Sequence, residues 1–175
     1  MSKLTAAYLA GLIDGEGSLE IQRIKGDQYK NGISYQARIR ICMTNKEIIK
    51  WLYESFGGYF CERVIEDKNF KNSYEWTLRN NRLVKPFINK TYPYLRVKKK
   101  HAEIIKRFLK TFNKNSYNRT ETKLGYGTGY HLEVKQEIIE RREKLFHQIR
   151  ELNKRGKSVQ PERLNRTTSL EEVIV

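Results

Sequence analysis

The sequence has few of the residues that build disulfide scaffolds or sulfur-rich metal sites. It contains two cysteines, Cys42 and Cys61, and three scattered histidines. Two thiols cannot form a disulfide-rich secreted scaffold or a four-ligand zinc site, and the histidines lack metal-binding spacing. We therefore expect an intracellular protein, in an organelle or a prokaryotic cytoplasm, in which any metal site uses oxygen ligands.

Long apolar runs, a signal-peptide layout and acidic residues are also scarce. No segment approaches the roughly 20 apolar residues of a membrane-spanning helix, so we expect no membrane partner. The 35 Lys and Arg residues outnumber the 20 Asp and Glu residues, which gives a formal charge of +15. Such an excess attracts polyanions, most often nucleic acid. A hydrophobic content of 38% excludes a disordered basic tail, so the chain should fold.

Hydrophobic periodicity predicts an α+β protein with one domain at 1–153. Its core is expected at 5–112, followed by a C-terminal loop and helix at 113–153 and a polar, flexible tail at 154–175. The expected elements are a helix at 5–14, strands at 18–25 and 33–43, a helix at 48–56 behind a capping box at 44–47, strands at 59–65 and 74–79, and helices at 83–88, 97–112 and 138–152. Residues 113–130 are rich in Asn, Thr and Gly, which indicates a long surface loop.

The predicted strands place apolar residues on one face and polar, largely basic residues on the other. The apolar face would pack on the helices, leaving an open antiparallel sheet. A ribbon of such strands fits the major groove of DNA, which is about 12 Å wide. The candidate DNA contacts on this face are Glu20, Gln22, Ile24, Ser34, Gln36, Arg38, Arg40, Cys42, Cys61, Arg63, Glu75, Thr77 and Arg79. Solvated side chains on an exposed sheet would give the same pattern for any one of them.

The segment at 9–17, Leu-Ala-Gly-Leu-Ile-Asp-Gly-Glu-Gly, combines small residues with two acids at a helix end. Two pairs of small residues four apart would let a second helix approach closely: Ala6 with Ala10, and Ala7 with Gly11. Asp14 and Glu16 fall where the helix dipole disfavours a carboxylate by about 0.3–1 kcal/mol. A hard divalent cation bound to Glu16 and exposed backbone carbonyls would explain this placement. A polar helix end with a glycine stop is the alternative.

This segment resembles the LAGLIDADG motif of homing endonucleases, and it departs from the motif only where Gly15 replaces Ala and Glu16 replaces Asp. The element order over 5–112 and the segment at 93–100, Pro-Tyr-Leu-Arg-Val-Lys-Lys-Lys, are also similar to the family. The resemblance implies an αββαββα fold whose twisted antiparallel sheet forms a DNA-binding saddle. It further implies an intron-encoded enzyme that makes a metal-dependent double-strand break in a long, pseudo-palindromic DNA target.

The motif occurs once, and single-motif members of the family act as homodimers with their motif helices at the two-fold axis. By this resemblance the dimer interface would contain Ala6, Ala7, Ala10, Gly11 and Asp14. The implied cofactor is Mg²⁺, with Mn²⁺ able to substitute and Ca²⁺ supporting binding without cleavage.

Three further roles follow from the resemblance, position by position. Glu16 would ligate the metal together with the Gly15 carbonyl, and Lys98 would stabilise the charge that develops on the phosphate. Asn45 falls near the expected position of the attacking water, although it also reads as a plain helix cap. The position four residues later, basic in relatives, is Ile49 here. Two alternatives stay open: a maturase that binds intron RNA, and a DNA-binding protein without cleavage activity.

Overall fold

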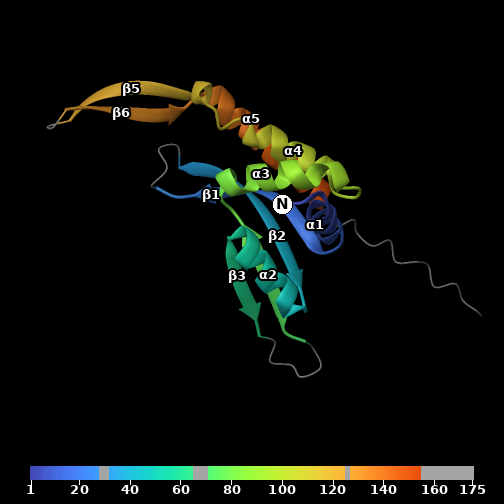
Figure 1. Ribbon diagram of the computed structural model, residues 1–175. Coiled ribbons are helices and arrows are strands. Elements are labelled where there is room, and N and C mark those ends of the chain that lie inside the picture. Colours follow the sequence, from blue (N-terminus) through green and yellow to red (C-terminus); the bar gives the residue numbers. More distant parts are fainter. Residues whose placement is uncertain (28–31, 65–70, 125–126, 155–175) are drawn as a thin grey trace, which may run out of the picture.

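Helices and strands follow one another in the order expected for the core, and a hairpin and a long helix come after it (Figure 1). The computed structural model describes residues 1–27, 32–64, 71–124 and 127–154. The helices are α1 (Lys3–Glu16), α2 (Lys46–Phe56), α3 (Asn81–Thr91), α4 (Lys99–Leu109) and α5 (Gln136–Asn153), and the strands are β1 (Gly17–Lys25), β2 (Ile33–Met43), β3 (Tyr59–Arg63), β4 (Ser73–Leu78), β5 (Tyr117–Leu124) and β6 (Gly127–Val134). All of the predicted tail beyond residue 154 lies outside the described residues.

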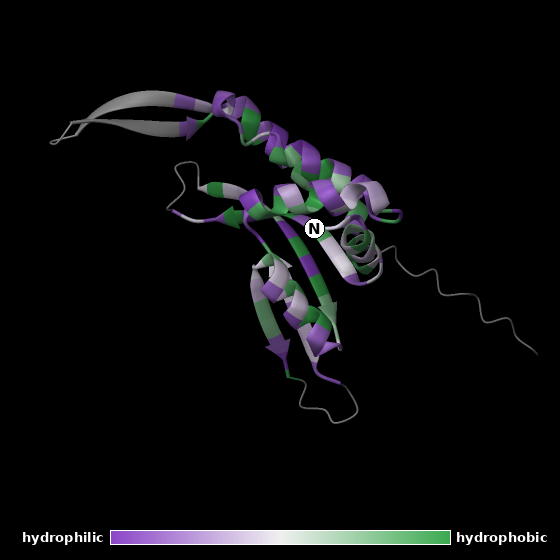
Figure 2. Cartoon of the chain, in the orientation of Figure 1, coloured by the Kyte–Doolittle hydropathy of each residue, from purple (hydrophilic) through white to green (hydrophobic). Residues whose placement is uncertain are grey.

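Four strands form one antiparallel sheet in the order β1-β2-β4-β3. Along β2, side chains alternate between the buried core and a partly exposed face, and its ribbon changes repeatedly between green and purple in Figure 2. The core face carries Leu19, Ile39 and Trp76, which are fully buried against the helices. The period-2 prediction of the sheet is therefore confirmed, because alternation selects one face for burial.

Gly17 joins α1 directly to β1. Its N–H donates to the carbonyl of Ile13, which ends the helix. A Cβ at this position would lie 2.8 Å from both the Cα and the carbonyl oxygen of Ile13, so a side chain cannot be accommodated without a backbone shift. The last residue of the helix, Glu16, is consequently placed at the very start of the first strand.

Helix α5 closes over the edge of the sheet and ties the C-terminal part to the core. The side chain of Asn153 donates to the carbonyl of Leu19 at 3.0 Å. Glu143 accepts a hydrogen bond from the hydroxyl of Tyr35 and pairs with Arg23 at 2.9 Å. Burial raises the pKa of Tyr35 to about 12, and the hydrogen bond to the Glu143 carboxylate adds to the shift.

The surface loop predicted at 113–130 is wrong. Residues 117–124 and 127–134 form a two-stranded antiparallel hairpin that extends beyond the rest of the fold (Figure 1). Its many Thr and Tyr residues are good strand formers. The prediction failed because a ribbon outside the core does not need the apolar alternation that revealed the other strands.

Several predicted boundaries also move. Helix α4 begins at Lys99 and not at Val97, whose side chain is 73% exposed although it was expected on the apolar face. Helix α3 runs longer than 83–88 and contains Pro86. The cap of α2 is Asn45 and not Thr44, since the Asn45 side chain accepts the N–H of Ile48. No helix in the described parts of the chain is long and apolar enough to cross a membrane.

Gly58 offers a test of the packing between α2 and the sheet. Its φ is +95°, and a Cβ there would lie 2.5 Å from the carbonyl oxygen of Thr77. Gly58→Ala should lower the free energy of unfolding by about 2 kcal/mol or more, because strain and overlap add. Gly32 also has a positive φ but open space, so Gly32→Ala should cost only about 1 kcal/mol. Equal losses in urea unfolding would contradict this account.

Candidate functional site

Glu16 ends α1 with an exposed side chain beside the open sheet. Within the described residues its carboxylate makes no hydrogen bond or ion pair. The same part of the chain contains no group of three or more His, Cys, Asp or Glu residues placed to hold a metal ion. An unpaired carboxylate of this kind suits a hard divalent cation that completes its ligands with other oxygens, such as those of phosphate.

Asp14 points the other way and binds the chain segment that precedes α4. Its carboxylate accepts the backbone N–H groups of Arg96 at 2.7 Å, Val97 at 3.2 Å and Lys98 at 2.8 Å. Burial of the carboxyl opposes ionisation, but these three hydrogen bonds outweigh it and lower the pKa of Asp14. Its carboxylate is thus engaged within its own chain, and a place for Asp14 in a dimer interface stays a prediction.

This contact brings Lys98 to the end of α1. The Nζ atom of Lys98 donates to the backbone carbonyl of Asp14 at 2.6 Å. An ammonium group is favoured there, since the C-terminal end of a helix dipole is negative. Two residues that lie 82 positions apart in the sequence, Glu16 and Lys98, are thus held at one end of one helix.

Asn45 lies at the start of α2, where its Oδ1 accepts the N–H of Ile48 at 3.1 Å. The contacts show that Asn45 caps α2, as the sequence allowed. Its role beside the attacking water stays a prediction. Ile49, at the position that is basic in relatives, is fully buried. Its neighbour Lys50 pairs with Glu54 at 3.7 Å on the surface of α2.

The strand register places the predicted DNA contacts on one face. Glu20 lies opposite Arg38, Arg40 opposite Thr77, and Cys61 opposite Glu75. Two of these residues are covered, however, with exposed fractions of 9% for Glu75 and 2% for Thr77. Neighbouring side chains shield both residues, and direct contact of either with DNA stays a prediction.

Tyr59 belongs to the same face but was missed. It is 61% exposed, and the guanidinium of Arg79 lies 5.2 Å from the centre of its ring. Arg79 itself follows the last residue of β4. The strand period could have revealed it, since Tyr59, Cys61 and Arg63 are two residues apart along β3 and share a face. An aromatic residue at the start of a strand, however, is more often part of the core.

The exposed side of α1 differs from the predicted one. Ala6 and Ala10 are buried in the core of their own chain, at 4% and 0% exposure, and their assignment to the dimer interface stays a prediction. The uncovered stripe at helical spacing comprises Leu4, Tyr8, Gly11 and Gly15, with Ala7 beside it.

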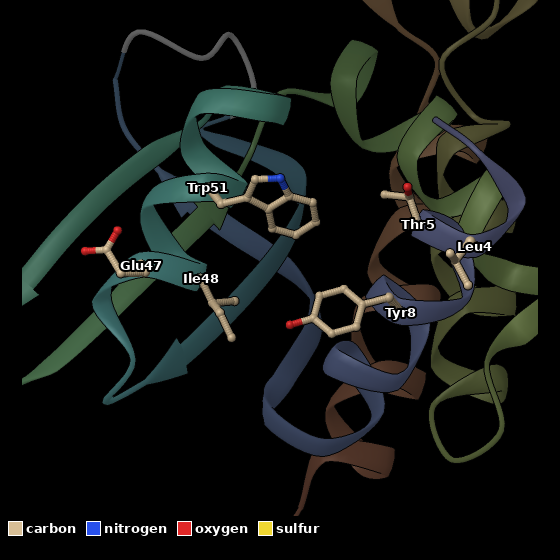
Figure 3. A pocket seen from close by; sticks show the side chains of 6 residues that line it. All are labelled: Leu4, Thr5, Tyr8, Glu47, Ile48 and Trp51. Carbon is tan, nitrogen blue, oxygen red and sulfur yellow. The ribbon is translucent and has the colours of Figure 1, made fainter.

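At its N-terminal end the exposed side of α1 borders an apolar groove of about 530 Å³ shared with α2. In Figure 3 Tyr8 projects from α1 into the space in front of Ile48 and Trp51 of α2. The rings of Tyr8 and Trp51 meet edge to face, with their centres 5.9 Å apart. Leu4, at 82% exposure, lies at the rim.

Comparison with known families settles the relationship. The profile of the LAGLIDADG endonuclease family matches residues 9–110. The chain belongs to this family. The match contains the second half of α1 and the whole of the four-stranded sheet, α2, α3 and α4, and it ends before the hairpin and α5. No curated protein sequence matches this LAGLIDADG chain.

Solved structures share the fold. The homing endonuclease I-CvuI, in complex with its target in the presence of Ca, aligns with a TM-score of 0.65 and 18% identity over 89% of this chain and 85% of that chain. The archaeal intron-encoded homing endonuclease I-Vdi141I, complexed with DNA, aligns with a TM-score of 0.60 and 16% identity over 87% of this chain and 86% of that chain. The LAGLIDADG homing endonuclease I-LtrWI, bound to target DNA, aligns at 0.60 and 17% over 85% of this chain but only 44% of that chain.

The LAGLIDADG segment thus separates its two acids by direction. The half-exposed Asp14 carboxylate binds the segment before α4, while the Glu16 side chain is exposed at the edge of the sheet. The sequence-based argument that both acids sit unfavourably at a helix end holds only for Glu16. For Asp14, the backbone N–H groups of the segment that leads into α4 provide the positive electrostatic environment that its own helix end does not.

We predict that Asp14→Asn lowers the free energy of unfolding by about 1 kcal/mol at pH 7, since a half-exposed, charged acceptor is lost. The pKa of Asp14 is lowered below 3.8, so the carboxylate stabilises the fold above that value. This stabilisation disappears as the pH falls through the lowered pKa. The free energies of unfolding of wild type and variant, measured in urea, should therefore differ by a constant amount above about pH 5 and converge in stronger acid. A pH-independent difference would contradict the assignment.

Proposed function

We propose that this chain is a homing endonuclease that binds a long, pseudo-palindromic DNA target as a homodimer and cuts both strands. The observation that carries the proposal is the convergence of Glu16 and Lys98 at one edge of a basic, open sheet. Hydrolysis of a phosphodiester can use a carboxylate that binds a cation, here Glu16, and a fixed positive charge beside it, here the ammonium group of Lys98. The DNA-bound state of I-CvuI, I-Vdi141I and I-LtrWI supports DNA as the substrate.

Glu16 would hold a divalent cation, with the Gly15 carbonyl as a second ligand. The bound ion would supply Lewis-acid stabilisation of the reacting phosphate and a more acidic water. Mg²⁺ is the proposed cofactor, Mn²⁺ a substitute, and Ca²⁺ an ion that supports binding without cleavage. The lack of a three-acid cluster in the described residues of one chain fits a site completed by phosphate oxygens.

Lys98 would contact the phosphate through the N–H groups of its ammonium that do not bind the protein. One N–H of its ammonium group donates to the Asp14 carbonyl, and two more remain. Because the Asp14 contact fixes the backbone of Lys98, its charge is already oriented before DNA arrives. Such preorganised charge stabilises a transition state without reorganisation during the reaction.

The proposed dimer would use the exposed stripe of α1. One chain offers one Glu16, so cutting two strands in place calls for a second copy. A monomer in water would leave Leu4, Tyr8 and the groove beside Trp51 exposed, which is unusual for a contiguous apolar surface. Alignment with less than half of the I-LtrWI chain agrees with a chain that supplies one of two units.

Replacing the proposed metal ligand tests the activity. Glu16→Gln should abolish cleavage and leave DNA binding within about tenfold, because it removes a ligand charge but little of the sheet contact. Wild type would be incubated with a randomised duplex library, using Mg²⁺ to detect cleavage and Ca²⁺ to recover bound targets. Glu54→Gln, the same charge change on α2, should cleave like wild type. Cleavage by Glu16→Gln at the wild-type rate would sink the assignment, and binding without cleavage by wild type would favour a DNA-binding protein.

The dimer is tested at Gly11, because a Cβ there meets nothing within 4 Å in its own chain. Gly11→Leu should leave the fold of one chain intact but separate two packed helices, so dimerisation and cutting should weaken together. Gly11→Ala, with a smaller side chain and better helix propensity, should lose less of both. Sedimentation and cleavage assays measure the two effects. A fully active Gly11→Leu protein would refute the α1 interface.

A further inference from the structure

Five charged side chains form a continuous chain of ion pairs across the four strands of the open face. Arg38 pairs with Glu20 at 2.5 Å, and Arg63 pairs with Glu75 at 2.5 Å. Arg40 lies between the two acids, 3.9 Å from Glu20 and 3.8 Å from Glu75. Three arginines and two glutamates therefore share one cluster, and only the central arginine lacks a short pair with either acid.

Hydroxyl groups fix the orientation of both carboxylates. The Oγ of Ser18 donates to Glu20 at 2.9 Å, and Thr77 Oγ1 donates to Glu75 at 3.0 Å. The side chains of the two acids are 24% and 11% exposed. These glutamates are held in place within the face and are not free to swing into solvent.

Carboxylates on a surface that meets phosphate oppose DNA binding, so they do not raise the affinity for DNA in general. If Arg63 left its pair to contact a phosphate, the Glu75 carboxylate would remain nearly buried without its closest partner. Abandoning a partly buried charge in this way is strongly unfavourable. The same argument holds, more weakly, for Arg38 and Glu20. The short pairs therefore restrain two arginines from indiscriminate contact with the DNA backbone.

Arg40 is in a different position. Its exposure, 36%, lies between the 18% of Arg38 and the 53% of Arg63, but it alone of the three interacts with an acid on each side at nearly equal distance. Its guanidinium can turn toward a base edge without breaking a short ion pair. The balanced attraction from two sides restricts the directions in which it points, which favours one bidentate geometry.

We propose that Glu20 and Glu75 are specificity-determining positioning residues, an inference that rests on the proposed function. They withhold Arg38 and Arg63 from nonspecific phosphate contacts and orient Arg40 toward one base pair of each half-site. Specificity is a difference between affinities, and these acids raise it by weakening binding to the wrong sequence.

The test compares wild type with Glu20→Gln and Glu75→Gln. A target duplex recovered from the randomised library in Ca²⁺ and a shuffled duplex of equal length and composition serve as probes, with binding followed by fluorescence anisotropy. Each variant should bind the shuffled duplex at least about fivefold more tightly and gain little on the target. The slope of log affinity against log salt on the shuffled duplex should steepen by about one, as expected for one additional phosphate contact. Base preference should relax at the pair read by Arg40.

Glu54→Gln serves as the matched control, because it makes the same charge change outside the sheet and should alter both duplexes equally and slightly. Thermal melting checks that each variant folds. If Glu75→Gln does not fold, Glu20→Gln alone tests the proposal. The proposal is overturned by an unchanged ratio of affinities, by equal losses on both duplexes, or by loss of a cytosine preference alone, which would mean that a glutamate reads the base. Failure of wild type to bind any duplex would instead remove the proposed function itself.

Discussion

One carboxylate holds the functional end of this molecule together. Asp14 accepts three consecutive backbone N–H groups from the segment before α4, and that segment supplies Lys98, whose ammonium returns to the end of α1. This contact joins the C-terminal end of α1, next to Glu16, to the segment before α4. Because backbone groups are the donors, the anchor depends on the acid and on the loop geometry and not on the identity of residues 96–98.

The open face shows the same use of charge for position. The chain as a whole carries an excess of 15 positive charges, yet the arginines on the sheet are paired with acids and not left as a uniform basic patch. In the proposed complex, long-range attraction would come from the whole molecule, while contact at the sheet would be restricted to side chains that are already oriented. Attraction and recognition would then be separated in space.

Sequence patterns predicted the core well because burial imposes periodicity. The alternation along 33–43 and the small, apolar segment at 9–17 identified β2 and α1, whose inward residues fill the core. The hairpin at 117–134 was missed since its strands lie outside that core. Val97 was misplaced because helical spacing could not reveal that a distant carboxylate holds its N–H outside the helix.

The candidate site shows the same limit at the level of single residues. The position of Glu16 at a helix end already suggested a cation ligand, but Lys98 was identified only by resemblance to a family. No local pattern could have placed the two at one helix end, because their proximity depends on a contact across 84 positions. Burial of Ala6, Ala10 and Thr77 likewise depends on packing between elements. Spacing shows which residues share a face, but not which neighbours cover that face.

The direct junction between α1 and β1 has a consequence for the geometry of any assembly formed through α1. No linker separates Glu16 from the first strand, and Gly17 allows no larger residue without a backbone shift. The angle at which two α1 helices cross would therefore be transmitted to both sheets as a rigid rotation. The number of base pairs between two half-sites, and the curvature of the DNA lying across them, would then be set by the packing of two helices.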